Sequence, residues 1–159
     1  EMGAKINIDN IMESGCSEMV CDIRVQYTKN LNAVTIKGDE VICMIDEIPI
    51  FCIVATQANG ISRICDSKEL KYKESDRLLA IYTNLRNMNA EVYEIDDGLS
   101  IKGKIKLYST SINHLNDHRI AMSFEILNLL VNGEMSSNYS EIIDVSFPEF
   151  YKTMKEIVK

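Results

Sequence analysis

Three short runs of polar residues in this sequence combine carboxylates or cations with a neighbouring apolar segment. Asp46-Glu47 lies between the apolar stretches Val41 to Ile45 and Ile48 to Val54. Lys71 to Arg77 places two lysines and an arginine around two carboxylates, and Asn116 to Arg119 adds an imidazole and a second arginine. Such cations bind the phosphate or carboxylate groups of small anions, and a carboxylate beside them can act as an acid or a base.

Two of these runs stand where a helix is expected to begin. The segment Glu74 to Met88 has apolar residues at helical spacing, and either Asn116 or Asp117 is expected to cap a helix that continues to Leu130. The first turn of a helix presents free N–H groups and a positive partial charge, which favour anionic ligands. We therefore expect an anion-binding face where these helix ends meet.

Each run also has a purely structural interpretation. Lys71 to Arg77 can be a solvated first turn in which carboxylates offset the helix dipole. Asp46 can be the N-cap of a helix that extends to Ala58, or a partly desolvated base tuned by cations. His118 and Arg119 lie in a first turn, where basic residues are disfavoured, which points to function; the alternative is a capped helix with an arginine that extends to solvent.

The chain resembles itself, which indicates a repeated architecture. Met2 to Ile6 returns as Met88 to Val92, and Val34 to Gly38 returns as Leu99 to Gly103. We expect two units, about residues 4–88 and 90–159.

Each unit shows the pattern strand, strand, helix, strand, helix, which predicts an α/β fold. In the first unit, Val20 to Tyr27 alternates like a half-buried strand and Ile61 to Cys65 is a short strand. In the second, Glu141 to Val145 is an expected strand, and Ser146 to Glu149 has the form of a capping box that opens a final helix.

Composition and charge argue against several classes of protein. The 159 residues are 46% hydrophobic and 26% charged, which is ordinary for one globular domain. A net charge of −7 argues against nucleic-acid binding. The chain has neither an apolar run long enough for a membrane span nor a signal-peptide pattern, so we expect a cytoplasmic protein without membrane contact.

The cysteines and histidines give no sign of a metal centre. The cysteine count is odd, and most members lie in apolar or alternating runs, so we expect reduced core residues. They are Cys16, Cys21, Cys43, Cys52 and Cys65. His114 has no ligand spacing around it, and no glycine-rich phosphate loop is present.

Four motifs, in order and spacing, resemble those of the 3-phosphoshikimate 1-carboxyvinyltransferase family, the EPSP synthases. They are Ile45-Asp46-Glu47-Ile48-Pro49, Lys71 to Arg77, Asn116-Asp117-His118-Arg119-Ile120-Ala121-Met122, and Ser146-Phe147-Pro148-Glu149-Phe150. The resemblance implies repeated βαβαββ units of the enolpyruvyl transferase fold, an inverse α/β barrel domain, with about two units here. It also implies that residues 1–159 are a fragment of the C-terminal domain and that the N-terminal domain is absent.

The activity implied by this resemblance is transfer of the enolpyruvyl group of phosphoenolpyruvate to the 5-hydroxyl of shikimate 3-phosphate, with release of phosphate, in aromatic amino acid biosynthesis. No metal or organic cofactor is implied. Asp46 falls at the position of the acid/base carboxylate. Glu74 matches the residue proposed to protonate the phosphoenolpyruvate methylene.

The remaining matched positions are implied to bind substrate. Lys73 matches a lysine near the shikimate ring, and Arg77 and Arg119 match a pair that clamps phosphoenolpyruvate. Asp117 and His118 are further candidates in the same motif. Guanidinium groups suit this task because they bind carboxylate and phosphate with paired hydrogen bonds.

Two positions depart from the family pattern. Val145 stands where some members have a lysine that contacts phosphoenolpyruvate, and Glu69 stands where some have an asparagine. The N-terminal domain of the same polypeptide is implied to supply further catalytic groups and most of the shikimate phosphate pocket, so the isolated chain is expected to be inactive. Two alternatives stay open: a domain like the sister enolpyruvyl transferase that acts on UDP-N-acetylglucosamine, and a truncated remnant that folds but binds nothing.

Overall fold

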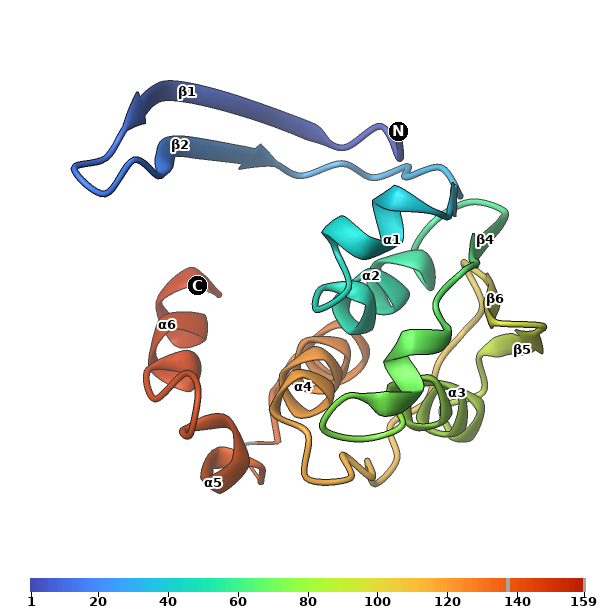
Figure 1. Ribbon diagram of the computed structural model, residues 1–159. Helices are drawn as coiled ribbons and strands as arrows, with labels where there is room; N and C mark the ends of the chain where they lie inside the picture. The colour runs from blue at the N-terminus through green and yellow to red at the C-terminus, as the bar shows by residue number, and fades with distance from the viewer. Residues whose placement is uncertain (137, 159) are drawn as a thin grey trace.

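A computed structural model of the chain describes residues 1–136 and 138–158 and shows a mixed α/β arrangement (Figure 1). The strands are β1 (Lys5–Glu13), β2 (Met19–Gln26), β3 (Thr35–Ile36), β4 (Ile61–Ile64), β5 (Glu91–Ile95) and β6 (Gly98–Lys102). The helices are α1 (Asp39–Cys43), α2 (Ile48–Ala55), the 3-10 helix η1 (Lys68–Tyr72), α3 (Arg77–Asn87), α4 (His118–Asn132), α5 (Ser140–Ile143) and α6 (Phe150–Ile157). No helix among the described residues has the length and apolar character needed to cross a bilayer.

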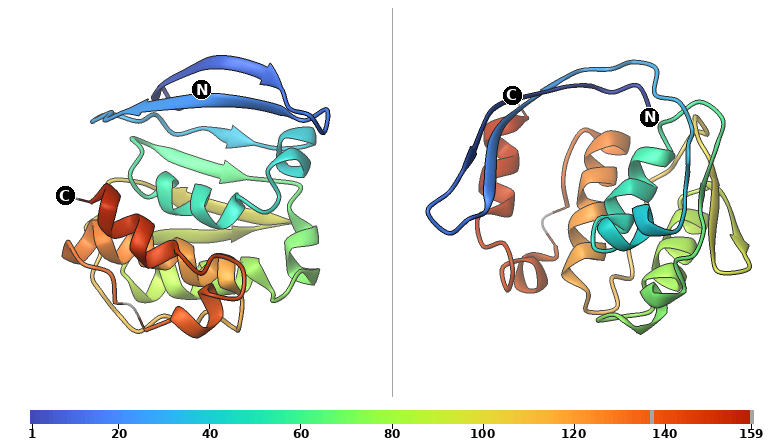
Figure 2. Two further views of the ribbon diagram at one scale, coloured as in Figure 1. Left: turned by 90° about the vertical axis from the view of Figure 1, so that its left-hand side faces the viewer. Right: turned by 45° about the horizontal axis from the view of Figure 1, so that its top comes forward.

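The strands form two sheets. β1 and β2 make an antiparallel hairpin, and the other four follow the order β3-β4-β6-β5, in which only the β3–β4 pair is parallel. Figure 2 shows the hairpin beyond the β3 side of the four-stranded sheet, with the helices gathered to one side of the strands.

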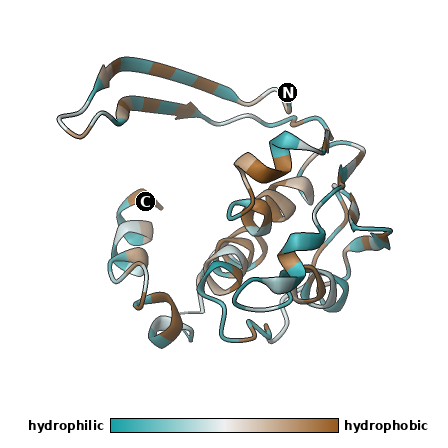
Figure 3. Ribbon diagram, in the orientation of Figure 1, coloured by the Kyte–Doolittle hydropathy of each residue, from teal (hydrophilic) through white to brown (hydrophobic). Residues whose placement is uncertain are grey.

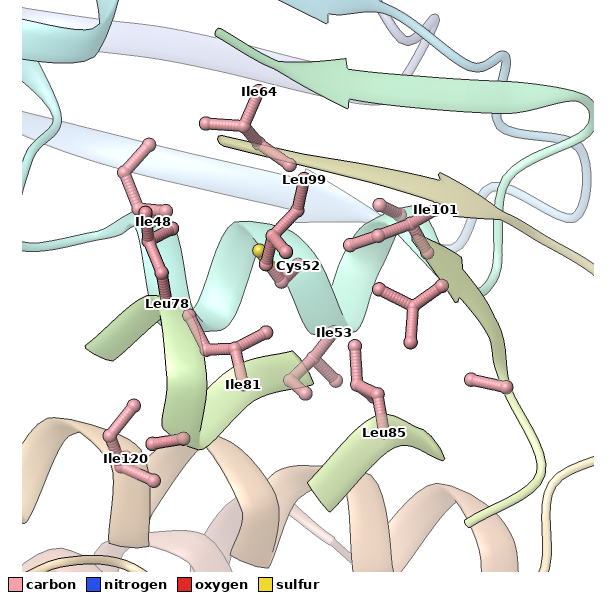
Figure 4. Close-up of a cluster of buried hydrophobic side chains, with 14 of the residues drawn as sticks. Ile48, Cys52, Ile53, Ile64, Leu78, Ile81, Leu85, Leu99, Ile101 and Ile120 are labelled. Carbon is pink, nitrogen blue, oxygen red and sulfur yellow. The ribbon is translucent and has the colours of Figure 1, made fainter. Parts of the chain in front are cut away.

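One face of the four-stranded sheet forms the core. Ile64 pairs with Leu99 across the β4–β6 ladder, and both side chains are buried. They point toward Cys52 of α2 and Ile81 of α3 (Figure 4). Each such side chain contributes roughly 1.5–3 kcal/mol on full burial, so this contact fixes the positions of α2 and α3 on the sheet.

Helix α2 lies in the centre of the structure because its sequence, Ile-Pro-Ile-Phe-Cys-Ile-Val-Ala, is apolar on every side. It packs on the sheet and on α4, and Figure 3 shows both helices as mainly hydrophobic. Pro49 stands in its first turn, where a missing N–H costs no hydrogen bond. A central apolar helix brings the ends of α3 and α4 together around it.

The helices predicted at Glu74 to Met88 and from Asp117 onward are confirmed as α3 and α4. Asp76 caps α3 by accepting a hydrogen bond from Leu79 N at 2.9 Å, and Asp117 caps α4. Helix α4 ends at Gly133, whose φ of 76° lies in the left-handed region that glycine adopts without strain. The strands expected near residues 61–65 and 20–27 are also confirmed, as β4 and β2.

Three local predictions are wrong. The strand expected at Glu141 to Val145 is the short helix α5 and a turn, because Ile143 is buried beside Ala121 of α4. The capping box does not form, since no side chain caps α6 and Glu149 pairs with Lys152. Asp46 is not an N-cap, since α2 begins two residues later and the Asp46 carboxylate binds arginines instead.

The hairpin and the cysteines are more exposed than predicted. Both strands of the hairpin are exposed along their whole length, although their residues alternate in polarity (Figure 3), because no described element covers either face. All five cysteines are free, as predicted, but only Cys52 is fully buried; Cys65 is partly buried, and Cys16, Cys21 and Cys43 are exposed.

The turn between β5 and β6 packs against the end of β4, and Gly98 makes this possible. A Cβ atom at Gly98 would lie 1.8 Å from the Ile64 carbonyl oxygen and 2.9 Å from Ser67 Oγ.

We predict that Gly98→Ala lowers the free energy of unfolding by about 1–3 kcal/mol because the backbone must shift. Gly15→Ala is the control, since nothing lies within 4 Å of its Cβ position, and it should change stability by less than about 0.5 kcal/mol. Urea denaturation measures the free energy of unfolding of both variants, and equal losses of stability would contradict the prediction.

Candidate functional site

The site is built around Arg77, the first residue of α3, whose side chain is 0% exposed. Its Nε donates to Asp117 Oδ2 at 2.8 Å, and its Nη1 donates to Asp46 Oδ1 at 2.9 Å. Its Nη2 donates to Glu74. One buried guanidinium thus joins carboxylates from three segments of the chain.

Asp117 is the buried partner of this arginine and is also 0% exposed. Its Oδ1 accepts the backbone N–H groups of Arg119 at 2.9 Å and Ile120 at 3.3 Å, which caps α4. Its Oδ2 accepts both the Arg77 Nε–H and the Ser75 hydroxyl, the latter at 3.1 Å. A single carboxylate therefore connects the first turns of α3 and α4.

Arg119, in the first turn of α4, is the more accessible arginine, at 33% exposure. Its Nη2 lies 3.2 Å from Asp46 Oδ2, and its Nη1 donates to the Asp46 carbonyl oxygen at 3.2 Å. Glu47 is a further partner at 3.4 Å. Asp46 thus bridges the two arginines, with one carboxylate oxygen on each.

These contacts set the charge states. The hydrogen bond from Arg77 lowers the pKa of Asp46 below its ordinary value, with help from the charges of Arg119 and Lys73, although burial opposes the shift. Burial also works against the charged form of Arg77, but its hydrogen bonds to Asp117 and Asp46 prevail and raise its pKa. At neutral pH Asp46 is therefore ionised and Arg77 is a permanent cation.

Lys73 and His118 lie at the border of this cluster. Lys73 Nζ is 2.9 Å from Glu69 Oε1, so Glu69 is the ion-pair partner of this lysine. Lys73 is also close enough to Asp46 for its charge to lower the pKa of that carboxyl. His118, the first residue of α4, is partly buried, and the structure assigns its imidazole no hydrogen bond among the described residues.

A pocket of about 260 Å³ opens beside Asp46 and Arg119. Its other lining is mainly apolar and comes from α2, α4 and α6; these residues are Ile50, Met122, Ser123, Ile126 and Phe150, with Glu47 at the rim. A larger hollow of about 380 Å³ lies near the far end of α4, but its lining includes no lysine or arginine. The smaller pocket is therefore the one that adjoins the cluster of Asp46 and Arg119.

The structure brings together the sequence-predicted residues Asp46, Glu74, Arg77, Arg119 and Asp117. Sequence reasoning assigned no part to Ser75 or Glu47, although both lie inside the motifs. Nothing in the sequence marks Ser75 as a functional residue except its position between Glu74 and Asp76. That its hydroxyl faces Asp117, 42 positions away, depends on how α3 meets α4.

Comparison with known proteins places this chain in a family. The sequence model described as EPSP synthase (3-phosphoshikimate 1-carboxyvinyltransferase) matches residues 1–154. The chain belongs to the EPSP synthase family. It is 41% identical over 158 residues to the 3-phosphoshikimate 1-carboxyvinyltransferase of Thermodesulfovibrio yellowstonii, and 40% identical over 159 residues to that of Aquifex aeolicus.

A solved structure agrees with this assignment. The EPSP synthase of Acinetobacter baumannii superposes on 98% of the chain with a TM-score of 0.87 and 30% sequence identity. The chain covers 36% of that protein, 36% of the Thermodesulfovibrio relative and 37% of the Aquifex relative. It therefore spans little more than a third of the length of the EPSP synthases it matches.

The two arginines should differ in their effect on folding. We predict that Arg77→Met lowers the free energy of unfolding by about 3–5 kcal/mol, because it leaves the buried Asp117 carboxylate without its cation. Arg119→Met is the matched control and should cost less than about 1 kcal/mol, because its ion pairs are partly exposed. Urea denaturation of the two variants decides the question, and similar losses would contradict the division between a buried and an accessible arginine.

Proposed function

We propose that this chain provides part of the active site of an enzyme that transfers the enolpyruvyl group of phosphoenolpyruvate to the 5-hydroxyl of shikimate 3-phosphate. The observation that carries the proposal is the position of Asp46 between Arg77 at 2.9 Å and Arg119 at 3.2 Å, beside an open pocket. A carboxylate among cations, next to space for an anion, is the arrangement this reaction needs.

The reaction has two steps, and each moves a proton. In the addition, the substrate hydroxyl oxygen bonds to C2 of phosphoenolpyruvate, the hydroxyl loses its proton, and the methylene carbon gains one. In the elimination, the new methyl group loses a proton and the C2–O bond to phosphate breaks. One group must therefore accept protons and another must donate them.

We assign the acceptor role to Asp46 and the donor role to Glu74. Asp46 is 42% exposed and ionised, so it can receive the hydroxyl proton and later the methyl proton. Glu74 is 50% exposed and hydrogen-bonded to Arg77, which holds it close to the same cluster. Both carboxyl groups therefore remain accessible to a substrate placed over the buried arginine.

We assign phosphoenolpyruvate binding to both arginines, with Arg119 as the direct contact. Arg119 is partly exposed and lines the pocket, so it can exchange its carboxylate partners for a ligand anion. Arg77 already donates through all three of its nitrogens, and a ligand reaches it only by displacing Glu74 or Asp46. Lys73, which is 26% exposed, is assigned to the shikimate moiety.

We further propose that the chain is part of the C-terminal domain and comprises about two repeat units, residues 4–88 and 90–159. Gly3 and Asn89, at matching positions of the repeat, both have positive φ, at 80° and 72°. Each precedes a hairpin, β1–β2 or β5–β6. The second domain of the whole protein would supply the remaining groups that bind the two substrates, including the shikimate phosphate.

The isolated 159-residue chain should show no transferase activity, because catalysis requires groups positioned around both anions. Phosphate release from phosphoenolpyruvate and shikimate 3-phosphate measures this, with a full-length relative as the positive control. Turnover by the chain within about tenfold of the control would contradict the proposed partial site. If a full-length protein carrying this chain is also inactive, the chain is a folded remnant.

The proposed roles predict different kinetic effects in a full-length protein that contains this chain. Arg119→Ala should raise KM for phosphoenolpyruvate about 30-fold, which corresponds to about 2 kcal/mol of lost charge-assisted binding. Asp46→Asn and Glu74→Gln keep the side-chain shape but remove the titratable group, and should lower kcat about 100-fold with little change in either KM. Steady-state kinetics of the three variants test the division. Near-normal kcat for both carboxylate variants rules it out.

A further inference from the structure

We propose that Asp117 is a positioning residue that holds the Arg77 guanidinium in the orientation from which it binds Asp46 and Glu74. The proposal rests on the proposed function for the roles of Asp46 and Glu74, but the geometry that supports it is independent of turnover. Asp117 would then not contact substrate, although its place in the motif makes it a candidate substrate-binding residue.

The hydrogen bonds of Asp117 leave no room for a ligand. An ionised carboxylate offers about four acceptor sites. In Asp117 these are used by the N–H groups of Arg119 and Ile120, by Arg77 Nε and by the Ser75 hydroxyl. The side chain is also 0% exposed, so a substrate cannot contact it directly.

The bond to Nε determines where the rest of the guanidinium points. The group is planar, and its N–H donors are fixed relative to one another. With Nε bound to Asp117, Nη1 is directed at Asp46 and Nη2 at Glu74. Because Asp117 is itself fixed to the backbone of α4, this arrangement transmits the position of α4 to Asp46 and Glu74.

Asp117→Asn tests the proposal in the chain itself. Asparagine is as good an N-cap as aspartate, so its oxygen keeps the bonds to α4. Its amide group then faces the Arg77 Nε–H, donor against donor, and the guanidinium loses its anchor. The readout is the pKa of Asp46, followed by carboxyl-carbon NMR during a pH titration.

The direction in which the pKa of Asp46 changes distinguishes a positioning role of Asp117 from the simple loss of its charge. The charged groups around Asp46 are Arg77, Arg119, Lys73 and Glu47, while Glu74 and Asp117 share Arg77 with it. Removal of the Asp117 charge alone would lower the pKa of Asp46 further. Loss of the Arg77 hydrogen bond instead raises it toward the ordinary value of 3.8. We expect a rise of about half a pH unit, a threefold change in acidity; no change or a fall overturns the proposal.

Asp76→Asn is the matched control. Asp76 caps α3 as Asp117 caps α4, and the substitution removes the same charge without touching a bond to Arg77. It should leave the pKa of Asp46 unchanged or slightly lower. A rise equal to that in Asp117→Asn would mean that any loss of a helix-cap charge has this effect, and would overturn the proposal.

A measurement on the unmodified chain covers the case in which Asp117→Asn does not fold. The Arg77 Nε–H, buried and bound to Asp117, should exchange with solvent at least about 100-fold more slowly than the Nε–H of the exposed Arg24. Equal exchange rates would refute the fixed orientation. A full-length protein without transferase activity but with a raised Asp46 pKa in Asp117→Asn would refute the proposed function and leave the positioning role intact.

Discussion

The structure depends on the burial of one guanidinium group. Transfer of an isolated charge into a protein interior costs several kcal/mol, and well-placed acceptors are needed to offset that cost. Each of the three guanidinium nitrogens of Arg77 donates to a carboxylate, and these carboxylates come from the loop before α2, the loop before α3 and the N-cap of α4. These segments cannot separate without exposing or unpairing the charge, so the arginine links the starts of α2, α3 and α4.

The hydrophobic core and this ionic cluster stabilise the same arrangement. The buried face of the four-stranded sheet holds α2 and α3, and α4 packs on α2, which brings the first turns of α3 and α4 to one edge of the structure. Leu78 and Ile120, close to the two arginines in sequence, are both buried in the core cluster (Figure 4). Apolar packing therefore sets the separation of Arg77 and Asp117, and the ion pair fixes their relative orientation. Arg119 lies outside the buried layer and remains partly exposed.

Much of the fold is readable from local sequence. Asp76 and Asp117 precede apolar patterns of helical period, so the start of each helix is marked, and Gly133 also marks the end of the second. The alternation in β1 and β2 predicts strands but not their burial, because burial depends on what covers a face. The segment after residue 140 has strand-like residues, yet forms a helix because Ile143 packs into the cluster of Ala121 and Phe150. Tertiary contacts override local secondary-structure propensity here because they offer an apolar side chain a buried position.

The sequence by itself determined which chemical types are present, in which order, and to which family the chain belongs: carboxylates at Asp46 and Glu74, arginines at Arg77 and Arg119, and a lysine at Lys73. It did not distinguish the arginines, which look equivalent in their motifs, nor show that Asp117 faces Arg77 rather than a ligand. Only the tertiary structure decided this, because the two residues are 40 positions apart and their contact depends on how α3 and α4 pack. Arg77 is buried and holds three carboxylates together, whereas Arg119 is partly exposed. The two arginines differ because the energy of a charge depends on its surroundings and not on its place in the sequence.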